Sequence, residues 1–203
     1  MGLQNDFLPG GAISVPNGDA VILLANQIQN DFKLIVATQD WHPANHVSFA
    51  ANHPGRAAGE VVKTRKGSQL LWPQYCVQKT RGAELASNLS FNRVNRVFKK
   101  GTDTGIGAYS GFYDDSHTQA TGMGEFLKSK RVNELFILGL ATDYAVKFTA
   151  LDAVGLGFKT YVYEDACRGL ELKTDDVAKA IKEMTAAGVE MIQSNVPLPV
   201  KRK

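Results

Sequence analysis

Short apolar runs of strand length alternate along this chain with longer segments in which apolar residues recur at helical spacing. The apolar runs, which we expect to be buried strands, are residues 34–38, 94–98, 135–138, 160–163 and 189–192. The segments with helical spacing are residues 19–32, 122–130, 142–154 and 174–187. Strands that alternate with helices form right-handed crossovers, which produce a mostly parallel sheet with helices on both faces. The pattern therefore predicts a three-layer α/β/α sandwich.

The length and composition agree with one globular domain. Open α/β folds of 203 residues commonly form a single unit, so we expect one domain over residues 1–203. No run approaches the roughly 20 apolar residues that cross a bilayer. The first residues show no basic region followed by an apolar run, which a secretory signal requires. We therefore predict a cytoplasmic protein without a membrane partner.

The charges argue against a nucleic-acid-binding protein, and the cysteines argue against a disulfide-rich or zinc-ribbon protein. The net charge of +3 is dispersed, and its one dense run, Lys201-Arg202-Lys203, has no interleaved aromatic residues. Such a run is typical of a solvated tail, so we expect no nucleic-acid partner. Cys76 and Cys167 lie far apart and form no CxxC pattern. We expect both thiols to be reduced, with no disulfide framework and no zinc ribbon.

Residues 47–81 form a long excursion from the expected sheet. The segment has neither helical nor strand periodicity, and several residues that break regular structure interrupt it. These residues are Pro54, Gly55, Gly59, Gly67 and Pro73. Long excursions in compact domains are often functional.

Polar residues that follow the apolar runs are the first candidates for a site, because ligands of parallel α/β sheets bind beyond the carboxyl ends of the strands. Asp40 and His42 follow the first run and would share one face of an extended chain, which is half of a metal site. An alternative is that Asp40 caps a turn and His42 lies on the surface. Both interpretations stay open on these two residues. Further polar candidates are His46, His53 and Glu60.

Two more strand ends carry possible chemistry. Lys100 follows the second run, where a lysine can be held near a reacting group, although a lysine at a strand end is more often solvated. The run 135–138 leads into a tight turn and a helix that begins near Thr142. Free backbone N–H groups at a helix start can bind an oxyanion or stabilise a thiolate. Ala145 occupies the first turn of this helix.

Motifs in a fixed order make the chain resemble the nicotinamidases of the isochorismatase-like hydrolases along nearly its whole length. The motifs are Gln4-Asn5-Asp6-Phe7, Asp40-Trp41-His42-Pro43, Leu71-Trp72-Pro73, Lys100-Gly101, Gly139-Leu140-Ala141-Thr142-Asp143-Tyr144, Val146-Lys147-Phe148-Thr149 and Asp165-Ala166-Cys167-Arg168-Gly169. Such enzymes hydrolyse nicotinamide to nicotinate and ammonia through a cysteine thioester. They use a Cys nucleophile, an Asp base and a Lys, beside a divalent metal, commonly zinc.

The resemblance assigns roles to several positions. Lys100 matches the catalytic lysine, and Asp40 and His42 match two metal ligands. The aromatic walls of the substrate pocket are matched by Phe7, Trp72 and Tyr109. The backbone N–H groups of Ala141 and Ala145 match the oxyanion hole, with a cis peptide bond expected between Leu140 and Ala141. The implied partner is a small aryl amide such as nicotinamide, and a homo-oligomer is compatible with the sequence.

Three side chains depart from the family pattern. The nucleophile position is Ala145, which has no sulfur, and the general-base position is Gly2, which has no carboxylate. The third metal ligand, a histidine in the family, is Tyr75, and a phenol of pKa ~10 binds zinc poorly at neutral pH. His46, His53 or Glu60 would have to supply a third ligand. We therefore expect weak metal binding and no turnover.

A fourth departure is that the family has a buried apolar strand before the segment that corresponds to Gln4-Asn5-Asp6-Phe7, where this chain offers only Met1, Gly2 and Leu3. A truncated or misassigned start would explain the missing strand and Gly2 together, and an engineered change would explain Ala145. A natural pseudoenzyme that binds nicotinamide or a partner without turnover is the alternative. A cysteine-independent isochorismatase is the least favoured reading, because such enzymes also need the missing Asp.

Overall fold

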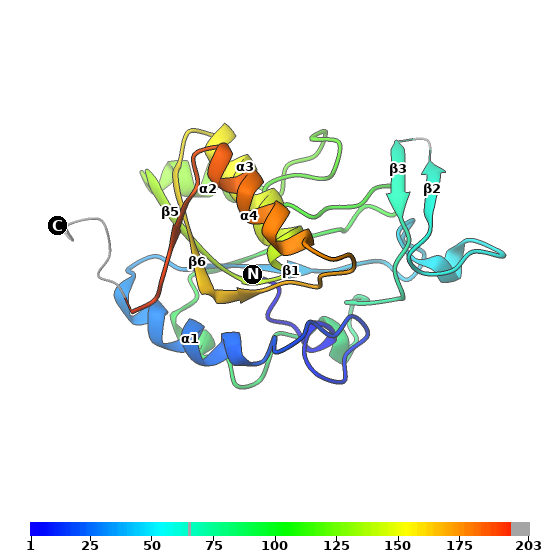
Figure 1. Cartoon of the computed structure of the whole chain (residues 1–203), viewed down its shortest axis with the longest axis horizontal. Coiled ribbons are helices and arrows are strands. Elements are labelled where there is room, and N and C mark those ends of the chain that lie inside the picture. Colours follow the sequence, from blue (N-terminus) through cyan, green and yellow to red (C-terminus); the bar gives the residue numbers. More distant parts are fainter. Residues whose placement is uncertain (65, 196–203) are drawn as a thin grey trace.

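The computed structural model describes residues 1–64 and 66–195, and its elements follow the alternation expected from the sequence (Figure 1). The strands of the central sheet are β1 (Val36–Asp40), β4 (Arg96–Lys100), β5 (Glu134–Leu140), β6 (Lys159–Arg168) and β7 (Glu190–Ile192). The helices are α1 (Ala20–Ile28), α2 (Met123–Ser129), α3 (Lys147–Gly155) and α4 (Asp176–Ala186). Each expected strand and helix is present, with ends that differ by a few residues.

The strands of the central sheet are all paired in parallel, but they form two separate pieces. β1 pairs with β4, with Asp40 opposite Lys100 at the carboxyl end. β5 pairs with β6, and β6 pairs with β7. Within the described residues no strand joins β1 to β5. The sheet is therefore interrupted between these two strands.

Helices cover both faces of the sheet and complete the three-layer α/β/α sandwich (Figure 1). On one face Ala150 of α3 and Met184 of α4 pack in one cluster with Ile137 of β5 and Val162 of β6. On the other face Ile28 of α1 packs against strand β6. The helices bury small or apolar residues at helical spacing, which explains why the sequence pattern located them.

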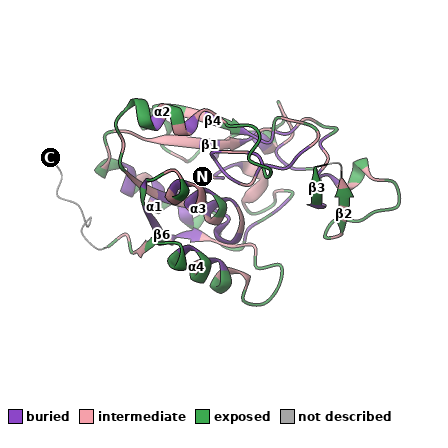
Figure 2. Cartoon of the chain, turned by 90° about the horizontal axis from the view of Figure 1, so that it is seen from above, coloured by how far each residue is buried: buried purple, intermediate pink, exposed green. Residues whose placement is uncertain are grey.

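The excursion over residues 47–81 is more ordered than its sequence indicates. It contains an antiparallel hairpin of β2 (Val61–Thr64) and β3 (Gly67–Leu70), which stands at one end of the molecule (Figure 2). The expectation of an aperiodic segment was wrong here, because a short hairpin with exposed side chains carries little apolar alternation. The rest of the excursion packs an aromatic cluster that includes Phe49, Trp72 and Tyr75.

Two strand ends differ from the expected boundaries in a way that matters for the site. β1 extends to Asp40 and β4 extends to Lys100, so both charged residues are the last residues of their strands. Pairing between the strands decides where each one ends, and apolar periodicity does not report that pairing. No helix in the described part of the chain is long and apolar enough to cross a membrane. The basic run at residues 201–203 lies outside the described residues.

Candidate active site

The predicted site residues meet at the carboxyl ends of β1, β4 and β5. A small cavity of about 30 Å³ lies there, beside the last residues of β1 and β4 and the turn that follows β5. The residues that line it are Phe7, Ile13, Asp40, Trp72, Tyr75, Lys100, Tyr109, Leu140, Ala141, Tyr144, Ala145 and Leu170. The sequence identified most of these residues. It missed Ile13, Tyr144 and Leu170, of which only Tyr144 had a signal, since it directly precedes the nucleophile position.

Lys100 and Asp40 form a buried ion pair at the centre of the site. The Lys100 Nζ atom donates to Asp40 Oδ1 at 2.6 Å and to the carbonyl oxygen of Ala108 at 2.8 Å. Both residues are buried, so the solvated alternative for Lys100 was wrong. The neighbouring Lys99 is the exposed one, and its Nζ lies 3.9 Å from the ring centre of Trp41. Charge-assisted bonds of this kind offset part of the cost of burying two charges.

Asp40 and His42, the two predicted metal ligands, lie close together. His42 Nε2 lies 4.0 Å from Asp40 Oδ1. His42 Nδ1 and Asp40 Oδ2 are buried, and neither has a hydrogen-bond partner among the described residues. Burial, followed by the nearby His46 and Lys100, lowers the pKa of His42 well below its usual value, so the imidazole stays neutral. A neutral imidazole and a carboxylate are suitable ligands, but Lys100 already neutralises the carboxylate.

Tyr75, which stands at the predicted third ligand position, lines the cavity and fills space in the site. Its ring centre lies 4.6 Å from that of His42 and 5.6 Å from that of Phe7. Burial raises the pKa of Tyr75 well above its usual value, with further contributions from Asp40 and other acidic groups. The phenol therefore stays protonated. A protonated phenol is a poor zinc ligand, so Tyr75 does not complete a metal site.

The three alternative ligands do not replace Tyr75. Both ring nitrogens of His46 are engaged, Nδ1 with Ser48 Oγ at 2.7 Å and Nε2 with the Ile106 carbonyl oxygen at 3.0 Å. His53 Nε2 bonds to the Val47 carbonyl oxygen at 2.7 Å. The Glu60 carboxylate accepts bonds from the Arg56 side chain and the Ala57 amide.

The described residues contain no group of three or more His, Cys, Asp or Glu side chains that could hold a metal ion. Zinc in protein sites is held by at least three protein ligands, so this donor set does not fit a tightly bound zinc ion.

Aromatic side chains form the walls of the cavity. Trp72 Nε1 donates to the Tyr109 hydroxyl at 3.0 Å, which fixes both rings. Tyr144 packs against both, with ring centres 5.1 Å from Trp72 and 5.3 Å from Tyr109. Phe7, which also lines the cavity, packs against the Tyr75 ring. Such walls suit a flat aromatic ring.

Ala145, which the resemblance predicts to be the nucleophile position, lies in a turn that the sequence located correctly. Residues Thr142–Val146 form one wide helical turn that leads into α3. The peptide bond between Leu140 and Ala141 is cis, as expected. The Asp143 carboxylate anchors the turn by accepting the amides of Leu170 and Glu171 at 3.0 and 2.9 Å. Ala145 faces the cavity with no reactive side chain.

Gly2, the predicted general-base position, is not among the residues that line the cavity. Gly2 has a φ of +60°, and a Cβ atom there would collide with the carbonyl oxygen of Leu140. The nearby Asp6 is engaged elsewhere, since its Oδ2 accepts the Cys76 amide at 2.6 Å and its Oδ1 the Ala12 amide at 3.3 Å. Asp40 is therefore the one carboxylate that lines the cavity among the described residues.

Neither cysteine lies where its thiol could act in the cavity. Both are free and buried, and neither lines the cavity. Burial, with the charges of Asp40 and Asp6, raises the pKa of the Cys76 thiol far above its usual value. Burial also raises the pKa of Cys167 to about 12. Neither thiol ionises appreciably near neutral pH.

Comparison with known proteins agrees with this arrangement. The isochorismatase domain family matches residues 1–196. The nicotinamidase of Escherichia coli K12 is 42% identical over 199 residues, covering 93% of this chain and 90% of that protein. A solved nicotinamidase/pyrazinamidase of Acinetobacter baumanii superposes with a TM-score of 0.92 at 43% identity, covering 95% of this chain and 92% of that one. The pyrazinamidase of Pyrococcus horikoshii, solved in complex with zinc, has a TM-score of 0.77 at 37% identity and covers 94% of each chain. The chain therefore belongs to the isochorismatase family of hydrolases, among its nicotinamidase and pyrazinamidase members.

Proposed function

We propose that this chain is a nicotinamidase-type amidohydrolase in fold and pocket, and that it does not turn over nicotinamide with Ala145 and Gly2 in place. One observation carries the proposal. The Lys100–Asp40 pair, the aromatic walls and the turn of Ala141 and Ala145 line one cavity, but no thiol among the described residues lies in it. The Escherichia coli nicotinamidase and the Acinetobacter baumanii nicotinamidase/pyrazinamidase match this chain over nearly its whole length at 42% and 43% identity.

The remaining groups support binding of a flat aryl amide. Trp72, Tyr109 and Phe7 would stack on or border its ring. The backbone N–H groups of Ala141 and Ala145 would donate hydrogen bonds to the amide oxygen, and the Lys100 ammonium would lie beside it. Attack on the carbonyl requires a nucleophile at position 145 and a proton transfer to the leaving ammonia. Neither group is present, so the reaction ends at binding.

The cavity limits how well such a ligand fits. A volume of about 30 Å³ accommodates about two water molecules, and nicotinamide is several times larger. Tyr75 is the side chain that both fills the cavity and departs from the family pattern. Ligand entry would therefore require Tyr75 or a neighbouring ring to move.

A natural pseudoenzyme that binds nicotinamide or a partner is the alternative, favoured by the loss of three separate side chains in one site. The gene upstream of the Met1 codon distinguishes the two. An in-frame apolar stretch that ends in Asp supports an enzyme whose start was misassigned, and its absence supports a pseudoenzyme. A cytoplasmic location and a role in pyridine nucleotide salvage belong to the same proposal.

We expect no nicotinamidase activity at any pH from pH 5 to 9. The described part of the chain offers no ionisable thiol near the turn at Ala145, because both cysteines are buried and hard to ionise. Ammonia release from nicotinamide, measured beside the Escherichia coli nicotinamidase as positive control, tests this expectation. Ammonia above background that disappears in Cys76→Ser or Cys167→Ser would show that one of these thiols is the nucleophile.

We expect a low, substoichiometric zinc content after dialysis. Asp40 and His42 are two ligands, and the protonated Tyr75 phenol adds none. Tyr75→His should raise zinc affinity by about 10–100-fold or more, since it supplies a third ligand and empties space beside His42. Elemental analysis measures the zinc content, and competition with a chromogenic chelator measures the zinc affinity. Tyr113→His is the matched control, because Tyr113 lies outside the cavity lining. One tightly held zinc per unaltered chain would contradict the expectation.

A further inference from the structure

Residues 106–111 lie between β4 and α2 in the chain and carry two groups of the candidate active site. The Ala108 carbonyl oxygen accepts a hydrogen bond from Lys100 Nζ at 2.8 Å. The Tyr109 ring lines the small cavity, and its hydroxyl accepts the Trp72 indole N–H at 3.0 Å. The 106–111 segment contains no helix or strand, so bonds to other parts of the chain must hold both groups in place.

Gly111 is the point at which this segment is held from two sides. Its amide donates to Thr149 Oγ1 at 2.8 Å, and its carbonyl oxygen accepts the Thr121 hydroxyl at 2.6 Å. A Cβ atom at Gly111 would lie 2.9 Å from Thr38 Cγ2 and 3.0 Å from Met123 Cε, so a larger residue would not fit without a shift. Gly111 is therefore a tightly packed anchor at the end of the segment.

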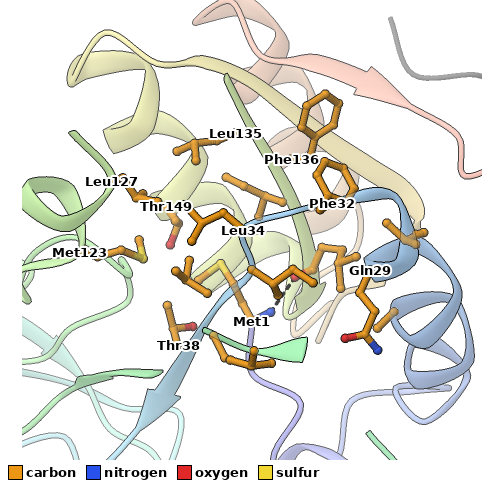
Figure 3. A pocket seen from close by; sticks show the side chains of 18 of the residues that line it. Met1, Gln29, Phe32, Leu34, Thr38, Met123, Leu127, Leu135, Phe136 and Thr149 are labelled. Carbon is orange, nitrogen blue, oxygen red and sulfur yellow. Dashed lines mark hydrogen bonds between the residues drawn. The ribbon is translucent and has the colours of Figure 1, made fainter. Parts of the chain in front are cut away.

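Thr149 lies on α3, the helix that follows the turn of Ala145. It is 3% exposed, and Figure 3 shows it with Met123 among the side chains that line a cavity of about 330 Å³ between β1 and β5. A threonine within a helix commonly bonds to the carbonyl oxygen four residues earlier. Here the hydroxyl oxygen accepts the amide of a residue 38 positions earlier in the chain. Thr149 therefore joins α3 to a loop that is distant in the sequence.

Phe148, the residue before Thr149, contacts the same segment from the surface. Its ring stacks on the Tyr109 ring, with ring centres 5.3 Å apart and an interplanar angle of 18°. Phe148 is 37% exposed, so this stack lies at the solvent side of the aromatic walls. Two consecutive residues of α3 thus contact the segment, one through the Tyr109 side chain and the other through the Gly111 backbone.

The bonds that Asp115 makes to the segment do not replace the bond from Thr149. The Asp115 carboxylate accepts the Tyr109 amide at 2.8 Å, and the Asp115 amide donates to the Gly107 carbonyl oxygen at 2.8 Å. Asp115 belongs to the same loop, so these bonds fix the shape of the loop and not its place beside α3. Within the described structure, the hydrogen bond between Gly111 and Thr149 is the one that joins the 106–111 segment to α3.

We propose that Thr149 is a positioning residue of the candidate active site, whose hydroxyl holds Gly111 so that the Ala108 carbonyl oxygen and the Tyr109 ring keep their places opposite Ala145. Thr149 is not among the residues that line the small cavity, so it acts through the backbone of the segment. The inference rests on the proposed function where it concerns binding of an aryl amide. The link from Thr149 to Tyr109 is testable without any ligand.

The test compares Thr149→Val, which keeps the shape of the side chain, with Thr149→Ser, which keeps the hydroxyl. Thr149→Val leaves the buried Gly111 amide without an acceptor, so amide hydrogen exchange over residues 106–112 should become about 5–30-fold faster. Thr149→Ser should restore slow exchange. Mass spectrometry of deuterated peptides measures the rates. Thr149→Ala, which removes the hydroxyl without adding bulk, is the second variant and should give the same result as Thr149→Val.

Trp72 supplies a spectroscopic measure of the Tyr109 position. The chain has two tryptophans, so in a Trp41→Phe background the emission comes from Trp72 alone. Thr149→Val should make Trp72 more accessible to acrylamide quenching, because the Tyr109 hydroxyl no longer holds the indole, and Thr149→Ser should reverse the change. In the same background nicotinamide should bind about 2–10-fold more weakly to the Thr149→Val protein, as isothermal titration calorimetry would show.

Thr160→Val is the matched control for loss of a buried threonine hydroxyl. Thr160 is 1% exposed and lies on β6, where its hydroxyl donates to the Phe158 carbonyl oxygen at 3.0 Å. This variant loses a comparable hydrogen bond, but it should leave exchange over residues 106–112 and the quenching of Trp72 unchanged.

Three results would overturn the proposal. The first is unchanged exchange over residues 106–112 in both Thr149→Val and Thr149→Ala. The second is an equal increase of exchange in β5 and β6, which would mean that Thr149 supports the fold in general. The third is failure of Thr149→Ser to restore exchange and quenching. Absence of nicotinamide binding in the unaltered chain would instead count against the proposed function, while exchange and quenching still decide the role of Thr149.

Discussion

A protein with Ala145→Cys alone is expected to react rapidly with iodoacetamide and to release no ammonia from nicotinamide. Position 145 lies in the first turn of a helix and lines one cavity with Lys100, and both features stabilise a thiolate. Turnover also needs a group that passes a proton to the leaving ammonia, which contributes about 10²–10⁴-fold, and Gly2 has no such group. Because catalytic groups act as a unit, restoring one of them recovers little.

Restoring turnover requires a change of backbone as well as of side chains. Gly2 has a φ of +60°, and a side chain there would collide with the Leu140 carbonyl oxygen, so Gly2→Asp alone cannot place a carboxylate correctly. An apolar strand added before Met1, with Gly2→Asp in an extended conformation and Ala145→Cys, should give measurable hydrolysis. Adding Tyr75→His should then improve it by tightening the metal and enlarging the cavity.

The order of these gains is the test. Mass spectrometry measures the alkylation and a coupled assay measures the ammonia. Ala150→Cys is the control, because Ala150 is also buried but lies within α3, away from the helix start. Full activity from Ala145→Cys alone would mean that position 2 is not the base. Asp6→Asn and Asp40→Asn in that background would then identify the carboxylate that is.

Replacing Lys100 with methionine should lower the free energy of unfolding by about 3–5 kcal/mol. The substitution leaves the buried Asp40 carboxylate without its ammonium partner, and Asp40 Oδ2 already lacks a hydrogen bond within the described structure. The double variant Asp40→Leu, Lys100→Met removes both charges, so it should be markedly more stable than either single variant. Urea unfolding followed by circular dichroism measures these differences.

Lys99→Met is the matched control for the ion pair. Lys99 precedes Lys100 on the same strand but is exposed, and its contact with Trp41 is a surface cation–π interaction worth about 0.5–1 kcal/mol. Its loss should therefore cost about 1 kcal/mol or less. Equal destabilisation by Lys99→Met and Lys100→Met would show that the ion pair contributes no more than a solvated lysine does.

The sequence by itself determined the order and type of the main elements and the edge of the sheet where the site lies. Apolar spacing is a local property, and it located the five strands and four helices of the sandwich. The identity of Ala145, Gly2 and Tyr75 is also fixed by the sequence, because a missing thiol, carboxylate or imidazole is visible without coordinates.

Only the tertiary structure decided how the polar side chains are paired. The Lys100 ammonium is hydrogen-bonded to Asp40, although from the sequence it was more often expected to be solvated. Both ring nitrogens of His46 are hydrogen-bonded, to Ser48 and Ile106, although from the sequence His46 was a candidate metal ligand. These bonds join residues up to 60 positions apart, which local patterns cannot report. The family resemblance predicted that an apolar strand is missing from the given sequence, but only the structure placed the gap between β1 and β5, because strand pairing is set by long-range packing and backbone hydrogen bonding.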